Sequence, residues 1–171
     1  MTLQNDYTEE ILQLPPDYEG AVKAVLIASK NNTGTRKCCL YLHGYVDYFF
    51  HPHLGEAFNK HGYDFYALDL RKYGRSLMPH QHPNYCKSLT EYFEEISIAI
   101  KKIKTQDQEL FLLGHSTGGL IASCYMNAGA EKELVNGLLL NSPFLDFNFT
   151  YFEKALSQSI AQVISKFSDF A

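Results

Sequence analysis

The sequence predicts an α/β fold whose sheet is mostly parallel and begins with antiparallel strands. Short apolar runs recur along the chain, and after the third run a helical pattern separates each from the next. Strands that alternate with helices are joined by crossover connections, which make the strands parallel and cover both faces of the sheet. The chain has 171 residues, enough for one domain with a buried core.

The first three expected strands follow one another with only turns between them, which indicates an antiparallel start. They cover Ile11–Leu14, which a pair of prolines ends, then Ala21–Ala28 and Cys38–Leu42. A cluster of turn-forming residues at 31–34 precedes the third strand.

The alternating part of the chain begins after the third strand. Apolar spacing and the capping box Ser88-x-x-Glu91 place its elements. In chain order they are a helix at Leu54–His61, a strand at Asp64–Leu70, a helix behind the capping box, a strand at Glu109–Leu113, a helix at Leu120–Asn127 and a strand at Leu134–Leu140. An amphipathic helix from Tyr151, with no strand after it, ends the pattern.

Composition and charge argue against several classes of protein. The formal net charge is -4 with acidic and basic residues interspersed, which argues against nucleic-acid binding. No apolar run approaches the roughly 20 residues that span a bilayer, and the N-terminus lacks the features of a signal peptide. The four cysteines have no zinc-site spacing. We therefore expect a cytoplasmic protein with reduced thiols, no metal, no cofactor and no transmembrane segment.

The segment Gly114-His115-Ser116-Thr117-Gly118 lies between an expected buried strand and an expected apolar helix. A Gly-x-Ser-x-Gly pattern in this position is typical of a nucleophile elbow. A strand that turns directly into a helix holds the serine in a strained backbone conformation, so Gly114 and Gly118 must lack side chains. The start of the helix also directs N–H groups toward a developing oxyanion. The sequence predicts Ser116 as a nucleophile.

On these residues the chain resembles the α/β-hydrolases. Within them it is similar to the branch that contains monoacylglycerol lipases, lysophospholipases and serine aminopeptidases of the S33 type. The resemblance covers residues 10–150 approximately. It implies a serine esterase or lipase that acts on a small acyl ester. The aromatic residues after Gly44 and the start of an apolar cap favour a lipophilic acyl group over a peptide.

His43-Gly44-Tyr45 directly follows the third expected strand, where the family carries its first oxyanion loop. The resemblance implies that the N–H groups of Tyr45 and Thr117 form the oxyanion hole. It gives His43 and Gly44 a supporting role.

Aromatic residues gather just after this loop, among them Tyr48 and Phe49. They are interpreted either as an apolar wall for an acyl chain or as packing between the loop and a cap. His51 and His53 follow, but no cysteine or carboxylate lies at ligand spacing, so no metal site is expected.

A third motif follows the fourth expected strand. Asp69, Arg71, Gly74 and Ser76 are similar to the family's Asp-x-Arg-Gly-x-Gly-x-Ser loop, and Lys72 stands in place of its first glycine. In the family this loop supports the nucleophile region, and a charge pair between Asp69 and Arg71 is expected here.

Serine catalysis also needs a base and an acid, which in this family follow the nucleophile. No histidine follows Ser116, and the side chain of His115 is expected to diverge from it. We therefore expect the N-terminal part of a hydrolase, with about six of eight strands. Residues 1–148 would belong to the core and residues 149–171 to the start of a helical cap. Such a part is predicted to be inactive alone.

Three explanations are open: a truncated chain, which is favoured, a sheet completed by a second chain, or a non-catalytic remnant. The unfinished sheet edge would allow self-association. The alternative function is an α/β-hydrolase-fold pseudoenzyme or ligand-binding module. A Rossmann-type nucleotide binder is disfavoured because neither Gly-x-Gly-x-x-Gly nor a lysine-containing phosphate loop is present.

Overall fold

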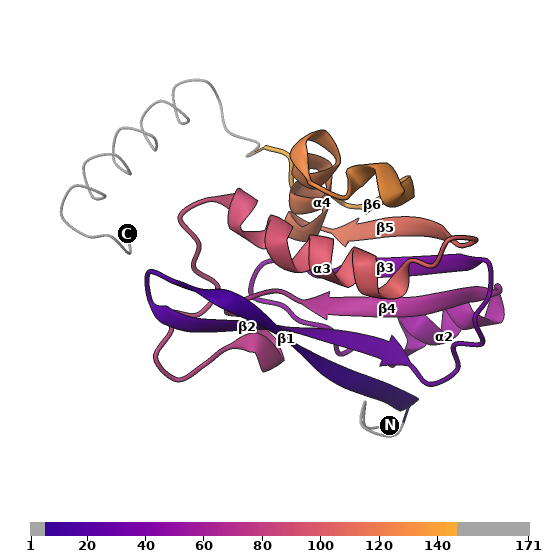
Figure 1. Ribbon diagram of the computed structural model, residues 1–171, viewed down its shortest axis with the longest axis horizontal. Coiled ribbons are helices and arrows are strands. Elements are labelled where there is room, and N and C mark those ends of the chain that lie inside the picture. Colours follow the sequence, from indigo (N-terminus) through magenta and orange to yellow (C-terminus); the bar gives the residue numbers. More distant parts are fainter. Residues whose placement is uncertain (1–5, 147–171) are drawn as a thin grey trace.

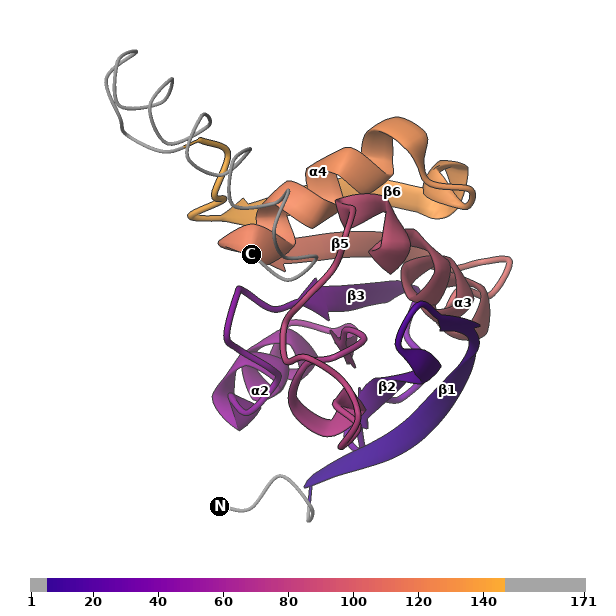
Figure 2. The same ribbon diagram turned by 90° about the vertical axis from the view of Figure 1, so that its left-hand side faces the viewer.

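The computed structural model describes residues 6–146. These residues form a six-stranded mixed sheet with helices on both faces (Figures 1 and 2). The predicted α/β class is confirmed. The expected cap at residues 149–171 lies outside the described residues, so the division of the chain at residue 148 stays a prediction.

All the strands and helices expected within residues 6–146 are present. The strands are β1 (Tyr7–Asp17), β2 (Gly20–Ser29), β3 (Lys37–Leu42), β4 (Tyr63–Asp69), β5 (Glu109–His115) and β6 (Val135–Asn141). The helices are α2 (Pro52–Lys60), α3 (Phe93–Ile103) and α4 (Thr117–Ala128), with short 3-10 turns η1 (Gly74–Ser76), η2 (Leu89–Tyr92) and η3 (Lys132–Leu134).

β1 is longer than expected and continues through Pro15 and Pro16. Proline cannot donate a ladder hydrogen bond, so it is tolerated in an edge strand or where the register shifts. β1 lies at the edge of the described sheet, and its register with β2 shifts between Leu14 and Asp17.

The strand order is β1-β2-β4-β3-β5-β6. β1 pairs antiparallel with β2, and β2 with β4, whereas β3, β4, β5 and β6 run parallel. The antiparallel start is confirmed for the first two strands. The third strand does not pair with the second, because β4 lies between them, and it stands inside the parallel part of the sheet.

Alternate residues of β3 point to opposite faces of the sheet and bury against different helices. Leu40 and Leu42 belong to the core beneath α3 and α4, whereas Cys39 and Tyr41 belong to the core on the α2 side. Figure 2 shows α2 on one side of the sheet and α3 and α4 on the other. Cys38 and Cys39 are both buried and free, on opposite faces of the sheet.

The capping box predicted at Ser88 is present. The Ser88 hydroxyl accepts the Thr90 N–H at 3.3 Å, and Glu91 accepts the Ser88 N–H at 3.1 Å. The 3-10 turn η2 that starts there leads directly into α3, which buries Ile96 and Ile100. Local sequence therefore fixes where this helix begins.

β6 forms the other edge of the described sheet, and among residues 6–146 it pairs only with β5. Leu139, on the α2 side, is 39% exposed. α2 covers β4 but not β5 and β6 (Figure 1). Within the region that the structure describes, no helix is long and apolar enough to cross a membrane.

Candidate active site

Three loops meet at the carboxyl ends of β3, β5 and β6. Parallel neighbouring strands end at the same edge of a sheet, so the residues that follow them are brought together. A Cβ placed on Gly44, after β3, would lie 3.3 Å from the Cβ of Ser116, after β5. The Ser116 N–H donates to Asn141 O, at the end of β6, over 3.1 Å.

Ser116 lies between the last residue of β5 and the first residue of α4, with φ 51° and ψ -120°. Side-chain-bearing residues rarely adopt positive φ, and such a conformation persists only where surrounding contacts hold it. The Ser116 carbonyl accepts the N–H groups of Gly119 and Phe144, both at 2.9 Å. The sharp bend that the sequence predicts is therefore present and is held from two sides.

The glycines of the elbow are required by close packing. A Cβ on Gly114 would lie 2.5 Å from the carbonyl oxygen of Gly118. A Cβ on Gly118 would collide with the carbonyl oxygens of Leu42 and His43 at the end of β3. Neither glycine has a positive φ, so crowding and not backbone freedom selects them.

Two backbone N–H groups beside the elbow have no hydrogen-bond acceptor among residues 6–146. In the described part of the chain, neither the Tyr45 N–H nor the Thr117 N–H donates a hydrogen bond. Thr117 is the first residue of α4, where the helix dipole favours a negative charge. The Ser116 hydroxyl likewise has no hydrogen-bond partner within residues 6–146.

His43 supports the loop that follows β3. It is 1% exposed, its Nε2 accepts the Leu70 N–H at 3.1 Å, and its Nδ1 lies 2.8 Å from Gly44 O. The Gly44 carbonyl can only accept and the Leu70 N–H can only donate, so the ring proton resides on Nδ1. Burial lowers the pKa of His43, which keeps the ring neutral. These contacts fit the supporting role that the resemblance implies.

His115 contacts the same carbonyl that accepts the Ser116 N–H, and its divergence from the serine side chain stays a prediction. Its Nδ1 lies 3.2 Å from Asn141 O. With His51 and His53 it lines a hollow of about 270 Å³ on the α2 side of the sheet. Among the described residues no histidine bonds to Ser116, and no cluster of three or more metal-binding side chains is found.

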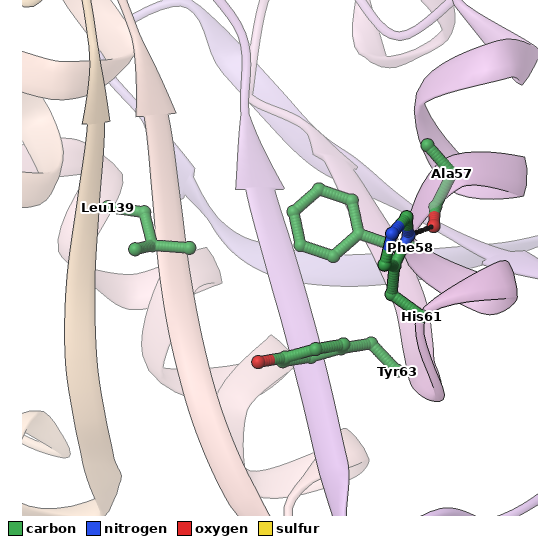
Figure 3. A pocket seen from close by; sticks show the side chains of 5 residues that line it. All are labelled: Ala57, Phe58, His61, Tyr63 and Leu139. Carbon is green, nitrogen blue, oxygen red and sulfur yellow. Dashed lines mark hydrogen bonds between the residues drawn. The ribbon is translucent and has the colours of Figure 1, made fainter.

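A second hollow, of about 310 Å³, lies between α2 and β6. Figure 3 shows Leu139 on one side of it and Phe58 and Tyr63 on the other. His61, also at its rim, bonds through Nδ1 with the Ala57 carbonyl over 2.8 Å. None of the described residues that line this hollow belongs to the elbow at 114–118.

The structure separates the two aromatic residues expected at a substrate pocket. Tyr48 is 41% exposed. Phe49 is fully buried and packs edge-on against Tyr7, with ring centroids 5.2 Å apart. Its N–H donates to Asp69 Oδ1 at 2.9 Å, which draws the residue inward. Phe49 is therefore a core residue, and the expectation that it lines a pocket is wrong.

The expected charge pair between Asp69 and Arg71 is also wrong. Asp69 Oδ2 lies 2.7 Å from Arg75 Nη1. Arg71 instead turns toward α3, where its Nη2 lies 2.7 Å from Glu95 Oε2 and 3.0 Å from Glu94 Oε2. The turn after β4 directs the two side chains to different elements.

Glu95 was not identified from the sequence, although it is fully buried in this pair. Its position on α3 carried a signal. Residue 95 stands three residues after Tyr92 and four before Ala99, which are both buried, so it lies on the core face of the helix. A carboxylate in that position needs a buried cation.

Lys72 contacts the turn between β1 and β2. Its Nζ lies 2.8 Å from Asp17 Oδ2 and also contacts Glu19 Oε2. Glu19 accepts the His82 N–H over 3.0 Å as well. This cluster ties the loop after β4 to the first hairpin.

Glu19 is expected to make folding sensitive to acid. Burial raises its pKa, but the contacts with Lys72 and His82 outweigh this and lower it from 4.5 to about 2. A pKa that is lower in the folded state stabilises the fold above pH 4.5, and this contribution is lost as the pH falls toward 2. In urea titrations the free energy of unfolding should decline over this window, and less steeply in Glu19→Gln. Parallel pH profiles of the two proteins would contradict this.

Comparisons with known proteins agree with this architecture. The sequence profile of the family described as serine aminopeptidase, S33, matches residues 33–169. Phospholipase YtpA of Bacillus subtilis is 33% identical over 90 residues, which are 53% of this chain and 33% of that protein.

Two solved structures are similar to the described fold. A soluble variant of monoglyceride lipase from Saccharomyces cerevisiae, in complex with a substrate analogue, matches with a TM-score of 0.68 and 23% identity, over 94% of this chain and 52% of that one. A carboxyl esterase from Bacillus coagulans matches with a TM-score of 0.64 and 20% identity, over 78% and 44%. This likeness confirms the α/β-hydrolase fold. The chain spans about a third of the curated relative and about half of these structures.

Proposed function

Because the chain belongs to the serine aminopeptidase S33 family of α/β-hydrolases, we propose that it is part of a serine hydrolase that cleaves carboxylic esters. Ser116 is the proposed nucleophile. The observation that carries the proposal is the backbone of Ser116, which has a positive φ between β5 and α4 and is flanked by two glycines whose Cβ positions are blocked. A conformation this unfavourable is typical of functional sites.

In the proposed reaction the Ser116 Oγ attacks the ester carbonyl carbon while a base takes the hydroxyl proton. The carbonyl oxygen becomes negative, and the N–H groups of Tyr45 and Thr117 stabilise it. The intermediate collapses to an acyl-serine, and the alcohol leaves with the proton. Water then releases the acid by the same steps. The proposal is supported by the lack of any other acceptor for these two N–H groups among residues 6–146.

The base and the acid are proposed to come from segments that the longer relatives have and the matched stretch does not include. His43 cannot act as the base, because Leu70 and Gly44 occupy both of its ring nitrogens. His115 is engaged with Asn141 O. We therefore expect the 171-residue chain by itself to have almost no turnover.

A lipophilic acyl ester is the proposed substrate. Tyr48 and Phe50 are both exposed on the loop that leads away from Gly44, with ring centroids 5.4 Å apart. Exposed aromatic rings that lie together favour an apolar ligand. The names of the phospholipase and the monoglyceride lipase among the relatives agree with this class.

Ser116→Ala is the variant that tests the nucleophile. We expect a fluorophosphonate probe to label the full-length product of the gene, with mass spectrometry placing the adduct on Ser116. Alanine should abolish labelling because it removes the attacking oxygen. Ser123→Ala is the matched control, since that hydroxyl lies further along α4 and donates to Gly119 O at 2.8 Å. It should be labelled like the natural protein.

Labelling of Ser116→Ala would refute the assigned nucleophile. A folded full-length product that neither reacts with the probe nor hydrolyses p-nitrophenyl esters would support the ligand-binding alternative. For the substrate class, we expect kcat/KM to increase from acetate to longer acyl esters.

A further inference from the structure

Lys72 occupies a backbone position that favours glycine. Its φ is 63°, and it is the third residue of a turn closed by the Tyr73 N–H, which donates to Leu70 O over 3.1 Å. Positive φ at the third position of a turn selects glycine or asparagine. A lysine remains there only if tertiary contacts hold it.

The side chain of Lys72 supplies those contacts. It is fully buried, and both carboxylates that meet its Nζ, Asp17 and Glu19, have side chains less than one tenth exposed. The Nζ also lies 4.2 Å from the centroid of the Tyr18 ring. The two contacts between the Nζ and the carboxylates are ion pairs. Three consecutive residues of the β1–β2 turn thus enclose one ammonium group.

The turn that contains Lys72 also holds His43 from two directions. The Leu70 N–H donates to His43 Nε2 at 3.1 Å, and the Tyr73 ring packs against the imidazole with centroids 4.8 Å apart. His43 in turn contacts the carbonyl of Gly44, the residue beside Ser116. A path of direct contacts therefore runs from the first hairpin to the loop at the elbow.

We propose that Lys72 is a positioning residue, whose ion pairs with the β1–β2 turn hold the 70–73 turn against His43 and so keep the Gly44–Tyr45 loop beside Ser116. A glycine would allow the same turn but would not anchor it. The consequence for ester hydrolysis rests on the proposed function. The effect of Lys72 on His43 does not depend on the proposed function, so an experiment can refute either claim and leave the other standing.

The same turn has a second anchor, the pair between Arg71 and Glu95. Removing the lysine should therefore loosen the turn without detaching it. The rival explanation is that Lys72 only balances two buried carboxylates and has no bearing on His43. The two explanations differ in what happens when all three charges are removed together.

Lys72→Met keeps the length of the side chain and removes its charge. In the 171-residue chain, we expect the Leu70 amide to exchange about tenfold faster relative to Leu40 in the core of β3. The imidazole ¹⁵N signals of His43 should move from the single Nδ1-protonated tautomer toward an average of both. Lys102→Met is the matched control. It removes an exposed ion pair with Glu10, 2.6 Å long, and should change neither signal.

The triple variant Lys72→Met, Asp17→Asn, Glu19→Gln leaves no uncompensated charge. We expect its free energy of unfolding to recover toward that of the natural chain while Leu70 exchange and His43 stay altered. If the free energy of unfolding, the Leu70 exchange rate and the His43 ¹⁵N signals of the triple variant all return to those of the natural chain, charge balance explains Lys72 and the proposal is overturned. Unchanged Leu70 exchange and His43 signals in the single variant would overturn it as well. If the single variant does not fold, the triple variant decides.

In the full-length product, Lys72→Met should lower kcat for an ester more than it changes KM, because the oxyanion loop acts in the transition state. A natural protein without hydrolysis would refute the proposed function and leave the results on His43 intact. Hydrolysis unaffected by Lys72→Met, together with altered His43 signals, would overturn the positioning role in catalysis.

Discussion

Replacing Gly118 by alanine is expected to destabilise the chain by more than about 3 kcal/mol, beyond the range typical of overpacked cores. The added Cβ would meet the carbonyl oxygens of Leu42, the last paired residue of β3, and of His43, the residue that follows it. Backbone atoms of a central strand cannot move aside as a flexible side chain can. The elbow and the loop beside it would have to separate.

The sign of this effect makes it diagnostic. Gly118 lies in the first turn of α4. At a solvent-exposed helix position alanine is favoured over glycine by up to about 1 kcal/mol. Urea denaturation of Gly118→Ala measures the net change. Ser123→Ala, a substitution toward alanine in the same helix, should cost about 1 kcal/mol at most, through its lost hydrogen bond to Gly119. A Gly118→Ala protein as stable as the natural chain would show that β5 and α4 do not meet β3 this closely.

Glu95→Ala is expected to destabilise the chain by about 3–5 kcal/mol, because it leaves the buried guanidinium of Arg71 without its main partner. Glu95 is fully buried and accepts hydrogen bonds from the Nε and Nη2 of Arg71 and from its backbone N–H. The alanine variant removes all of these acceptors at once. Chemical denaturation checks the magnitude.

Glu94→Ala is the matched control, since Glu94 contacts the same guanidinium at 3.0 Å but its side chain is 41% exposed. Exposed ion pairs contribute about 1 kcal/mol or less. The double variant Arg71→Met, Glu95→Leu should recover much of the lost stability, because no buried charge is left unpaired. Equal losses in Glu94→Ala and Glu95→Ala would contradict the burial of the Arg71–Glu95 pair.

Local features of this chain were predictable from the sequence. The alternation of strands and helices predicted the α/β fold, the capping box predicted the start of η2 and α3, and Gly114 and Gly118 predicted a crowded bend at Ser116. Each depends on residues within a few positions of one another, so hydrophobic period, capping chemistry and steric size suffice. The resemblance to a family then indicated which loops meet at the elbow.

Other features were decided only by the tertiary structure. The sequence paired Asp69 with its neighbour Arg71, but Arg71 binds Glu95, 24 residues away, and Lys72 binds the β1–β2 turn. Phe49 was grouped with the exposed Tyr48 until the backbone contact with Asp69 placed it in the core. Long-range partners depend on the order of strands in the sheet, and here β4 lies between β2 and β3. Charge and aromaticity are local properties of a sequence, whereas the partner that a buried group finds depends on which distant segments the sheet brings beside it.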